Sequence, residues 1–257
     1  MSAVINTNVR SMFASSALAT NERQMGVAMN QLSTGKRTFS ASVDAAGLAL
    51  ADKLTSQIRG TQMAVQNIND GISYLQTSEG ALNEITNMAQ RMYELAVQQA
   101  NGTQSAEALL SITAEMGDLA DGIDDIIANT EWNGTVVGTT MDITISGDGT
   151  TATFVPSAPI AAADVDSGST AAELETFIAA VATQRAEAGS AINRLGYMAD
   201  NLSNLATNLS ASRSRTQDTD YAAASAELAR TQIINQAATA MLAQANQSSQ
   251  SVLSLLK

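Results

Sequence analysis

The sequence contains no cysteine and no histidine in its 257 residues. Without these side chains it cannot form a disulfide, a thiol nucleophile, a Ser-His-Asp triad or an imidazole metal site. Catalysis would depend on carboxylates, lysine or tyrosine alone. The composition therefore predicts a protein that is not an enzyme and has no catalytic residue, cofactor or metal site.

Aromatic residues and prolines are also scarce. Phe, Trp and Tyr make up only 4% of a chain that is 45% hydrophobic, and Pro156 and Pro159 are its two prolines. A core of small aliphatic side chains suits close packing between helices, and the scarcity of proline leaves nearly all of the chain free to be helical. A mainly α fold is the expectation.

Positive charge is in short supply as well, because 13 Lys and Arg residues face 25 Asp and Glu residues. A net charge of −12 disfavours nucleic acid and anionic membranes. No apolar run approaches the ~18 residues that suggest a membrane span, so we expect no membrane insertion. The segment 1–8 lacks the basic and apolar regions of a cleaved signal peptide, which leaves a cytoplasmic protein or export by another route.

Heptad patterns are present at both ends of the chain. Leu18, Met25 and Leu32 repeat every seventh residue before Gly35, a typical helix C-cap. A last helix is expected over about 220–256, with two seams: Ile234, Met241 and Leu255; and Ala238, Ala245 and Val252. An apolar stripe on a terminal helix needs a cover, and the first helix is the natural candidate. Because both helices are rich in small and polar residues, their pair is expected to order fully only on assembly.

Three further helices are predicted between the ends. One begins near Asp44, an acceptable N-cap, and ends near Asn101; the next covers about 105–129. The third begins at the capping box Thr170–Glu173 and continues to about Ser210. Its two heptad seams are Ile178, Arg185, Ile192, Ala199 and Ala206; and Val181, Ala188, Leu195, Leu202 and Leu209.

In the middle of the chain, the spacing of apolar residues changes from a helical pattern to the alternation typical of a strand. Apolar and polar residues alternate over 141–145, and residues 153–155 fit a return strand. The intervening Gly147-Asp148-Gly149 fits a plain turn better than a calcium site, and the Ser and Thr residues of 135–170 are candidate glycan acceptors. The predicted fold is a long, coiled-coil-like antiparallel helical bundle with paired N- and C-terminal helices and a short β-hairpin in the middle.

Many short motifs at both ends resemble those of bacterial flagellin, in the same order and spacing. At the N-terminal end they are Ile5-Asn6-Thr7-Asn8, Leu32-Ser33-Thr34-Gly35-Lys36-Arg37, Asp44-Ala45-Ala46-Gly47-Leu48-Ala49, Gln57-Ile58-Arg59-Gly60, Asn67-Ile68-Asn69-Asp70-Gly71-Ile72 and Glu94-Leu95-Ala96-Val97-Gln98. At the C-terminal end they are Asn201-Leu202, Ser212-Arg213-Ser214-Arg215, Asp218-Thr219-Asp220-Tyr221, Leu242-Ala243-Gln244-Ala245-Asn246-Gln247 and Val252-Leu253-Ser254-Leu255-Leu256. The joint regions depart from the family at Val43 and at Thr216-Gln217.

The resemblance implies an extracellular, self-polymerising subunit of the flagellar filament, exported through the flagellar apparatus without a cleaved signal. It implies an inner domain of 1–43 and 213–257, an outer-core bundle of 44–133 and 170–212, and an exposed variable region of 134–169. Implied partners are other copies of the chain, an export chaperone, the filament cap and the hook-junction proteins. Two alternatives remain: a hook–filament junction protein of the same family, and a secreted ligand of the flagellin-sensing Toll-like receptor.

The heptads and the resemblance together give candidate sites. The candidate residues for filament assembly are Val9, Phe13, Leu18, Met25, Leu32, Ile234, Met241, Val252, Leu255 and Leu256. The candidate residues of the outer-core seam are Ile192, Leu195, Leu202 and Leu209. A receptor contact is implied for Gln90, Arg91, Leu95 and Glu115, which also suit contacts between subunits. The acidic stripe Glu115, Asp118, Asp121 and Asp125 fits a solvated helix face, or a bridge to arginine on another subunit.

Overall fold

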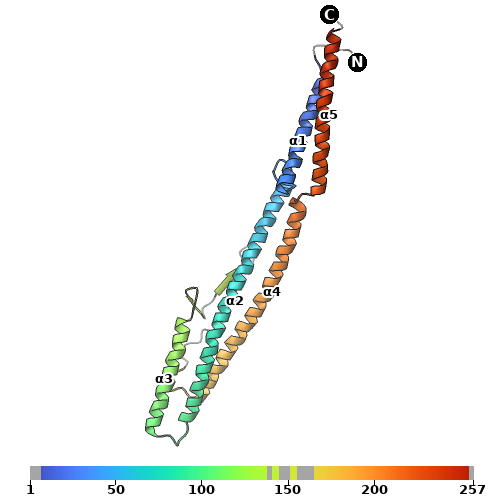
Figure 1. Cartoon of the computed structure of the whole chain (residues 1–257). Helices are drawn as coiled ribbons and strands as arrows, with labels where there is room; N and C mark the ends of the chain where they lie inside the picture. Colours follow the sequence, from blue (N-terminus) through green and yellow to red (C-terminus); the bar gives the residue numbers. More distant parts are fainter. Residues whose placement is uncertain (1–6, 138–140, 145–150, 155–164, 255–257) are drawn as a thin grey trace. The chain divides into compact units, whose positions relative to one another are not determined.

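The computed structural model describes residues 7–137, 141–144, 151–154 and 165–254. They divide into two compact units, one within Met1–Ser56 and Leu209–Lys257, and the other comprising Gln57–Asn208. In chain order the elements are α1 (Val9–Thr34), α2 (Ala45–Gln99), α3 (Ala106–Asn129), β1 (Glu131–Trp132), β2 (Thr135–Val136), β3 (Met141–Thr144), β4 (Thr151–Phe154), α4 (Ala171–Gln217) and α5 (Tyr221–Ser254). The predicted mainly α fold with paired terminal helices and a short hairpin is confirmed (Figure 1).

Polar caps determine where the helices begin. The Asn8 side chain accepts a hydrogen bond from Ser11 N–H at 3.1 Å, and Ser105 accepts one from Ala108 N–H at 3.2 Å. Asp44 and Asp220 act in the same way, accepting from Gly47 N–H and from Ala222 N–H, each at 2.8 Å. These bonds satisfy N–H groups that have no partner within the helix. The expected starts near 44, 105 and 220 are therefore confirmed.

The predicted capping box opens α4. Thr170 N–H donates to Glu173 Oε2 at 2.8 Å, and the Thr170 hydroxyl donates to the same oxygen at 2.9 Å. These hydrogen bonds lower the pKa of the Glu173 carboxyl. The helix continues to Gln217, seven residues beyond the predicted end at Ser210.

The capping box predicts a pH effect. Because the pKa of Glu173 is lowered in the folded chain, its contribution to stability is present above the pKa of an unfolded glutamate and is lost as the pH falls through the folded value. In Glu173→Gln, the stability of the fold should therefore decrease less as the pH falls than it does in the unchanged chain. Thermal unfolding from neutral to acid pH measures the change, with Glu175→Gln as the control outside the box. Curves of equal slope for the unchanged chain and Glu173→Gln would contradict it.

The unit Gln57–Asn208 has two apolar core clusters. The first joins α2, α3 and α4, and its buried members are Leu82, Ile85, Ala89, Met92, Leu95, Ala96, Ile112, Met116, Ala120, Ile123, Val165, Leu174, Phe177 and Val181. The second joins α2 and α4 to the strands, through buried Ile68, Tyr74, Leu75, Ile143 and Leu195. Both predicted seams of α4 lie inward, since every member is buried or half-buried.

The two hairpins lie in different sheets. β3 pairs with β4 in antiparallel register, as predicted, with Met141 opposite Phe154 and Thr144 opposite Thr151. The predicted turn Gly147-Asp148-Gly149 lies outside the described residues. The smaller β1–β2 hairpin was not predicted, although its turn Asn133-Gly134 is a strong hairpin signal, with φ of 50° and 77°.

The β3–β4 hairpin packs against α2 at Gly71, where the side chain of Ile143 lies close to the helix backbone. A Cβ atom built at Gly71 would collide with Cδ1 of Ile143, whereas one at Gly80 on the same helix would meet nothing within 4 Å. Gly80→Ala should therefore stabilise the chain by about 1 kcal/mol through helix propensity. Gly71→Ala should instead destabilise it, because overpacking costs about 1–3 kcal/mol. Chemical denaturation measures both changes. Equal stabilisation by the two substitutions would contradict the close contact between Gly71 and Ile143.

Candidate assembly site

Helices α1 and α5 pack side by side in antiparallel directions (Figure 1). Two cross-helix hydrogen bonds give the register: Asn8 Nδ2 donates to the Ala245 carbonyl at 3.3 Å, and Asn21 Nδ2 donates to the Thr231 carbonyl at 2.7 Å. Asn21 is 4% exposed and Thr231 is fully buried, so a polar contact lies in the middle of the seam. Neither residue was predicted, because a lone asparagine in a polar helix gives no sequence signal.

The seams between these helices are made largely of small residues. On α1 the inward positions are Ala14, Asn21 and Ala28, together with half-buried Leu18, Met25 and Leu32, the predicted stripe. On α5 they are Ala224, Thr231, Ala238 and Ala245, together with Leu228, Asn235 and Leu242. Alanine at so many contacts lets the two backbones approach closely and buries little apolar area.

One predicted seam of α5 is wrong. Ile234 and Met241 were expected to lie under the first helix, but they are 43% and 65% exposed. Their places are taken by Leu228, Asn235 and Leu242, which have the same spacing and a different phase. The side of α5 that faces α1 carries the alanines of the seam, and Ile234 and Met241 lie outside that contact.

Large apolar side chains therefore remain uncovered on the terminal pair. On α1, Val9, Met12 and Phe13 are 49%, 63% and 73% exposed, and on α5 Ile233 is 67% exposed. We call Val9, Met12, Phe13, Ile233, Ile234 and Met241 the exposed apolar set. Of the remaining predicted assembly residues, Val252 belongs to α5, while Leu255 and Leu256 lie outside the described residues.

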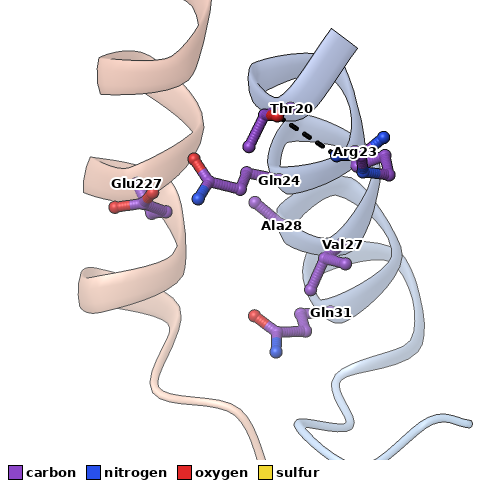
Figure 2. A pocket seen from close by; sticks show the side chains of 7 residues that line it. All are labelled: Thr20, Arg23, Gln24, Val27, Ala28, Gln31 and Glu227. Carbon is purple, nitrogen blue, oxygen red and sulfur yellow. Dashed lines mark hydrogen bonds between the residues drawn. The ribbon is translucent and has the colours of Figure 1, made fainter. Parts of the chain in front are cut away.

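A shallow groove lies beside this seam (Figure 2). It has a volume of about 310 Å³ and is lined by Thr20, Arg23, Gln24, Val27, Ala28, Gln31 and Glu227. Gln24 and Gln31 extend from α1 toward α5, and Arg23 donates to the Thr20 hydroxyl at 3.1 Å. Five of its seven lining residues are polar or charged, and none of the seven belongs to the exposed apolar set.

The two chain segments that adjoin the terminal pair bind each other. Residues 35–44 lead from α1 to α2, and residues 216–220 comprise the end of α4 and the link to α5; we call the two segments the connector junction. Arg37 N–H donates to the Gln217 carbonyl at 2.6 Å, and the Arg37 guanidinium donates to the Thr216 carbonyl at 2.7 Å. Thr219 N–H donates to the Gly35 carbonyl at 3.0 Å.

The departures from family motifs fall at this junction and leave its hydrogen bonds intact. Thr216 and Gln217 contribute main-chain carbonyls, so these bonds do not depend on which side chains stand there. Val43 is 39% exposed, and the neighbouring Asp44 caps α2 and lies 3.6 Å from the Arg37 guanidinium. The role of Arg37 was missed because its partners are carbonyl groups far away in the sequence.

The predicted outer-core seam residues lie inward. Leu195 is fully buried in the second core cluster, where Ile192 and Leu202 pack against it, and Leu209 is half-buried. Because Ala191, Met198 and Ala199 pack there as well, α4 contributes a broad apolar face to this cluster.

The residues of the implied receptor contact are split between surface and core. Arg91 donates to Glu115 Oε1 at 2.8 Å and to Glu94 Oε2 at 3.1 Å, and Gln90 is exposed beside it. The hydrogen bond with Glu115 is the main cause of the raised pKa of Arg91. Leu95, by contrast, is 2% exposed and belongs to the first core cluster.

The acidic stripe of α3 lies at the surface, with Glu115, Asp118, Asp121 and Asp125 all exposed. In the part of the chain that the structure describes, no group of three or more acidic side chains is arranged to hold a metal ion. Within the same residues, no helix is both long and apolar enough to cross a membrane.

Comparison with known proteins covers nearly the whole chain. The model of the bacterial flagellin N-terminal helical region matches residues 5–137, and that of the C-terminal helical region matches residues 172–256. A flagellin of Halalkalibacterium halodurans is 36% identical, covering 99% of this chain and all of the relative. The flagellar filament 33 kDa core protein of Treponema phagedenis is 35% identical with the same coverage.

Among solved structures, the crystal structure of Bacillus cereus flagellin is 32% identical, with a TM-score of 0.48, and covers 58% of this chain and 94% of that one. A flagellin of Bacillus subtilis is 36% identical over 98% of this chain and 99% of its own length. On the two family matches and this end-to-end similarity, the chain belongs to the bacterial flagellin family.

Proposed function

We propose that this chain is a structural subunit of the bacterial flagellar filament, used for motility, and that it polymerises through the exposed apolar set of α1 and α5. The observation that carries the proposal is the exposure of large apolar side chains, of which Phe13 at 73% is the most exposed on these two helices. Large apolar side chains left uncovered on two paired helices indicate a contact with a partner. Here the family supplies that partner, which is another copy of the chain.

Seeded polymerisation tests this function. Purified chain is dissociated by heat, mixed with short fragments of its own filaments and examined by electron microscopy. We expect long filaments whose mass grows with the supply of monomer. Short assemblies that stop growing would favour the hook–filament junction alternative, and a chain that stays monomeric at all concentrations would refute the proposal.

The same role implies further partners. We include among them an export chaperone, the filament cap and the hook-junction proteins, with secretion through the flagellar export apparatus to the extracellular filament. Support comes from family membership and from the thin, alanine-rich seam between α1 and α5, which suits a pair that completes its folding after export.

A contact with the flagellin-sensing Toll-like receptor is proposed for the surface around Arg91. Gln90, Arg91 and Glu115 are exposed there, and three hydrogen bonds, two to Glu115 and one to Glu94, hold the guanidinium in place. Leu95 would support this surface from the core. Binding of the receptor ectodomain to free subunits is the measurement, and affinity unchanged by Arg91→Ala would remove the proposal.

A further inference from the structure

We propose that the connector junction sets the antiparallel register of α1 and α5, with Arg37 as its positioning residue. The junction pairs main-chain atoms of residues 35–37 with those of residues 217–219, and Lys36 and Asp218 form an antiparallel bridge there. Thr38, in the same connector, is fully buried. The segment after α1 is therefore held against the end of α4.

The covalent connections alone leave the register open. Residues 218–220 join α4 to α5 directly, so the start of α5 stays near the end of α4. Residues 35–44 form a longer connection that could span roughly 33 Å when extended. Sliding α1 by one heptad along α5 requires about 10 Å. The chain could therefore reach more than one register if nothing held residues 35–44.

The seam between α1 and α5 does not choose between such registers either. Ala14 and Ala28 on α1 face a row of small residues that repeats every seven positions on α5: Ala224, Thr231, Ala238 and Ala245. A slide of one heptad brings small residues opposite small residues again. The cross-helix bonds of Asn8 and Asn21 go to main-chain carbonyls, which every turn of α5 offers.

The junction, in contrast, contains groups that the repeating seam of α5 does not offer. The carbonyls of Thr216 and Gln217 belong to the last turn of α4, where no following N–H of the helix reaches them. The Arg37 main-chain N–H donates to the Gln217 carbonyl, and its guanidinium donates to the Thr216 carbonyl. The positive charge of the guanidinium lies at the C-terminal end of α4, where the helix dipole favours cations. The same guanidinium is 3.6 Å from Asp44, the cap of α2. A slid register would break all of these contacts together.

The register has a consequence that rests on the proposed function. With Asn8 beside Ala245 and Asn21 beside Thr231, Met12 on α1 lies at the level of Met241 on α5. The junction therefore aligns the apolar side chains of the two helices at a fixed level. Loss of the junction would offset them by one heptad in part of the population.

Engineered disulfides can report the register, because the chain has no cysteine of its own. Ala14→Cys with Ala238→Cys marks the observed register, one heptad from the Asn21–Thr231 contact. Ala14→Cys with Ala245→Cys marks the register reached when α1 slides by one heptad toward the C-terminal end of α5. Each pair is placed in the full chain, alone and together with Arg37→Ala, Arg37→Lys or the control Arg10→Ala, which changes an exposed arginine on α1 outside the junction.

The measured quantity is the ratio of disulfide yields for the two pairs under a mild oxidant. We expect the observed pair to dominate in the unchanged chain and in Arg10→Ala. In Arg37→Ala the main-chain hydrogen bond to Gln217 remains, but the guanidinium loses its hydrogen bond to the Thr216 carbonyl and its ion pair with Asp44. The ratio should therefore fall at least about tenfold, because a hydrogen bond from a charged group is lost. Arg37→Lys keeps a cationic donor and should restore most of the ratio.

Several results would overturn the proposal. An unchanged ratio in Arg37→Ala, or an equal fall in Arg10→Ala, would show that Arg37 does not select the register. If neither pair closes in Arg37→Ala, the residue holds the helices together and does not choose their alignment. Failure of the observed pair in the unchanged chain would contradict the register itself.

The outcome is separable from that of the proposed function, because disulfide yield does not require a filament. Seeded polymerisation of the unchanged chain is measured in parallel. Filaments together with a ratio insensitive to Arg37 would leave the proposed function standing and remove the junction proposal. A ratio that falls in Arg37→Ala, for a chain that forms no filaments, would support the junction proposal and remove the proposed function.

Discussion

A chain carrying both Phe13→Ser and Met241→Ser is expected to fold and to fail to polymerise, even in the presence of seeds. The two side chains are 73% and 65% exposed in the single chain, so their replacement removes few contacts within it. In the filament we place them against neighbouring subunits, where burial of each is worth about 1.5–3 kcal/mol. Loss of one such contact should raise the critical concentration roughly ten- to a hundred-fold.

The critical concentration is measured by sedimentation after seeded growth, and helical content by circular dichroism. Phe13→Leu with Met241→Leu is the matched control, because leucine keeps an apolar side chain at both positions. We expect the control to polymerise within a few-fold of the unchanged chain. Normal filament growth by the serine variant would contradict the role given to the exposed apolar set.

The second large effect is expected in the core of the unit Gln57–Asn208. Leu195→Ala should lower the free energy of unfolding by about 2–5 kcal/mol, since it deletes a side chain with no exposed surface and leaves a cavity. Ile68, Tyr74 and Ile143 lie around that site, so the damage reaches both α2 and the β3–β4 hairpin. Urea or thermal denaturation measures the loss.

Leu205→Ala is the control for this prediction. Leu205 lies on the same helix and is 43% exposed, so its truncation should cost less than about 1 kcal/mol. A similar loss of stability in the two variants would mean that Leu195 has no special place in the second core cluster.

Local signals in the sequence were sufficient to predict where the helices begin. Asp44, Ser105 and Thr170 are polar caps that precede apolar periodic segments, and each opens a helix where it was expected. The heptads of α4 correctly identified its inward side, with Leu195 fully buried. Such features depend on neighbours within one turn or one heptad, which the sequence displays directly.

The side of α5 that faces α1 could not be predicted from such local signals. Ile234 and Met241 have the spacing of a seam, and so do Ala238 and Ala245. Periodicity identifies the stripes of a helix and does not say which of them meets a particular neighbour. The alanine contacts with α1 decided the orientation, and the larger side chains remained exposed.

Long-range main-chain contacts were also beyond the sequence. Arg37 lies 179 residues from Thr216, and its acceptors are carbonyls that every residue possesses. The buried contact between Asn21 and Thr231 is of the same kind. The β1–β2 hairpin is different, because its Asn133-Gly134 turn was present in the sequence and was simply missed.

The central claim is that the apolar residues left exposed on α1 and α5 are the surfaces that hold neighbouring subunits together. Electron cryomicroscopy of filaments grown from the unchanged chain tests it most directly, through the exposure of Phe13 and Met241 in the assembled state. Both are more than 60% exposed in the single chain. We predict that both are buried against other subunits in the filament, and finding them in open solvent there would contradict the account.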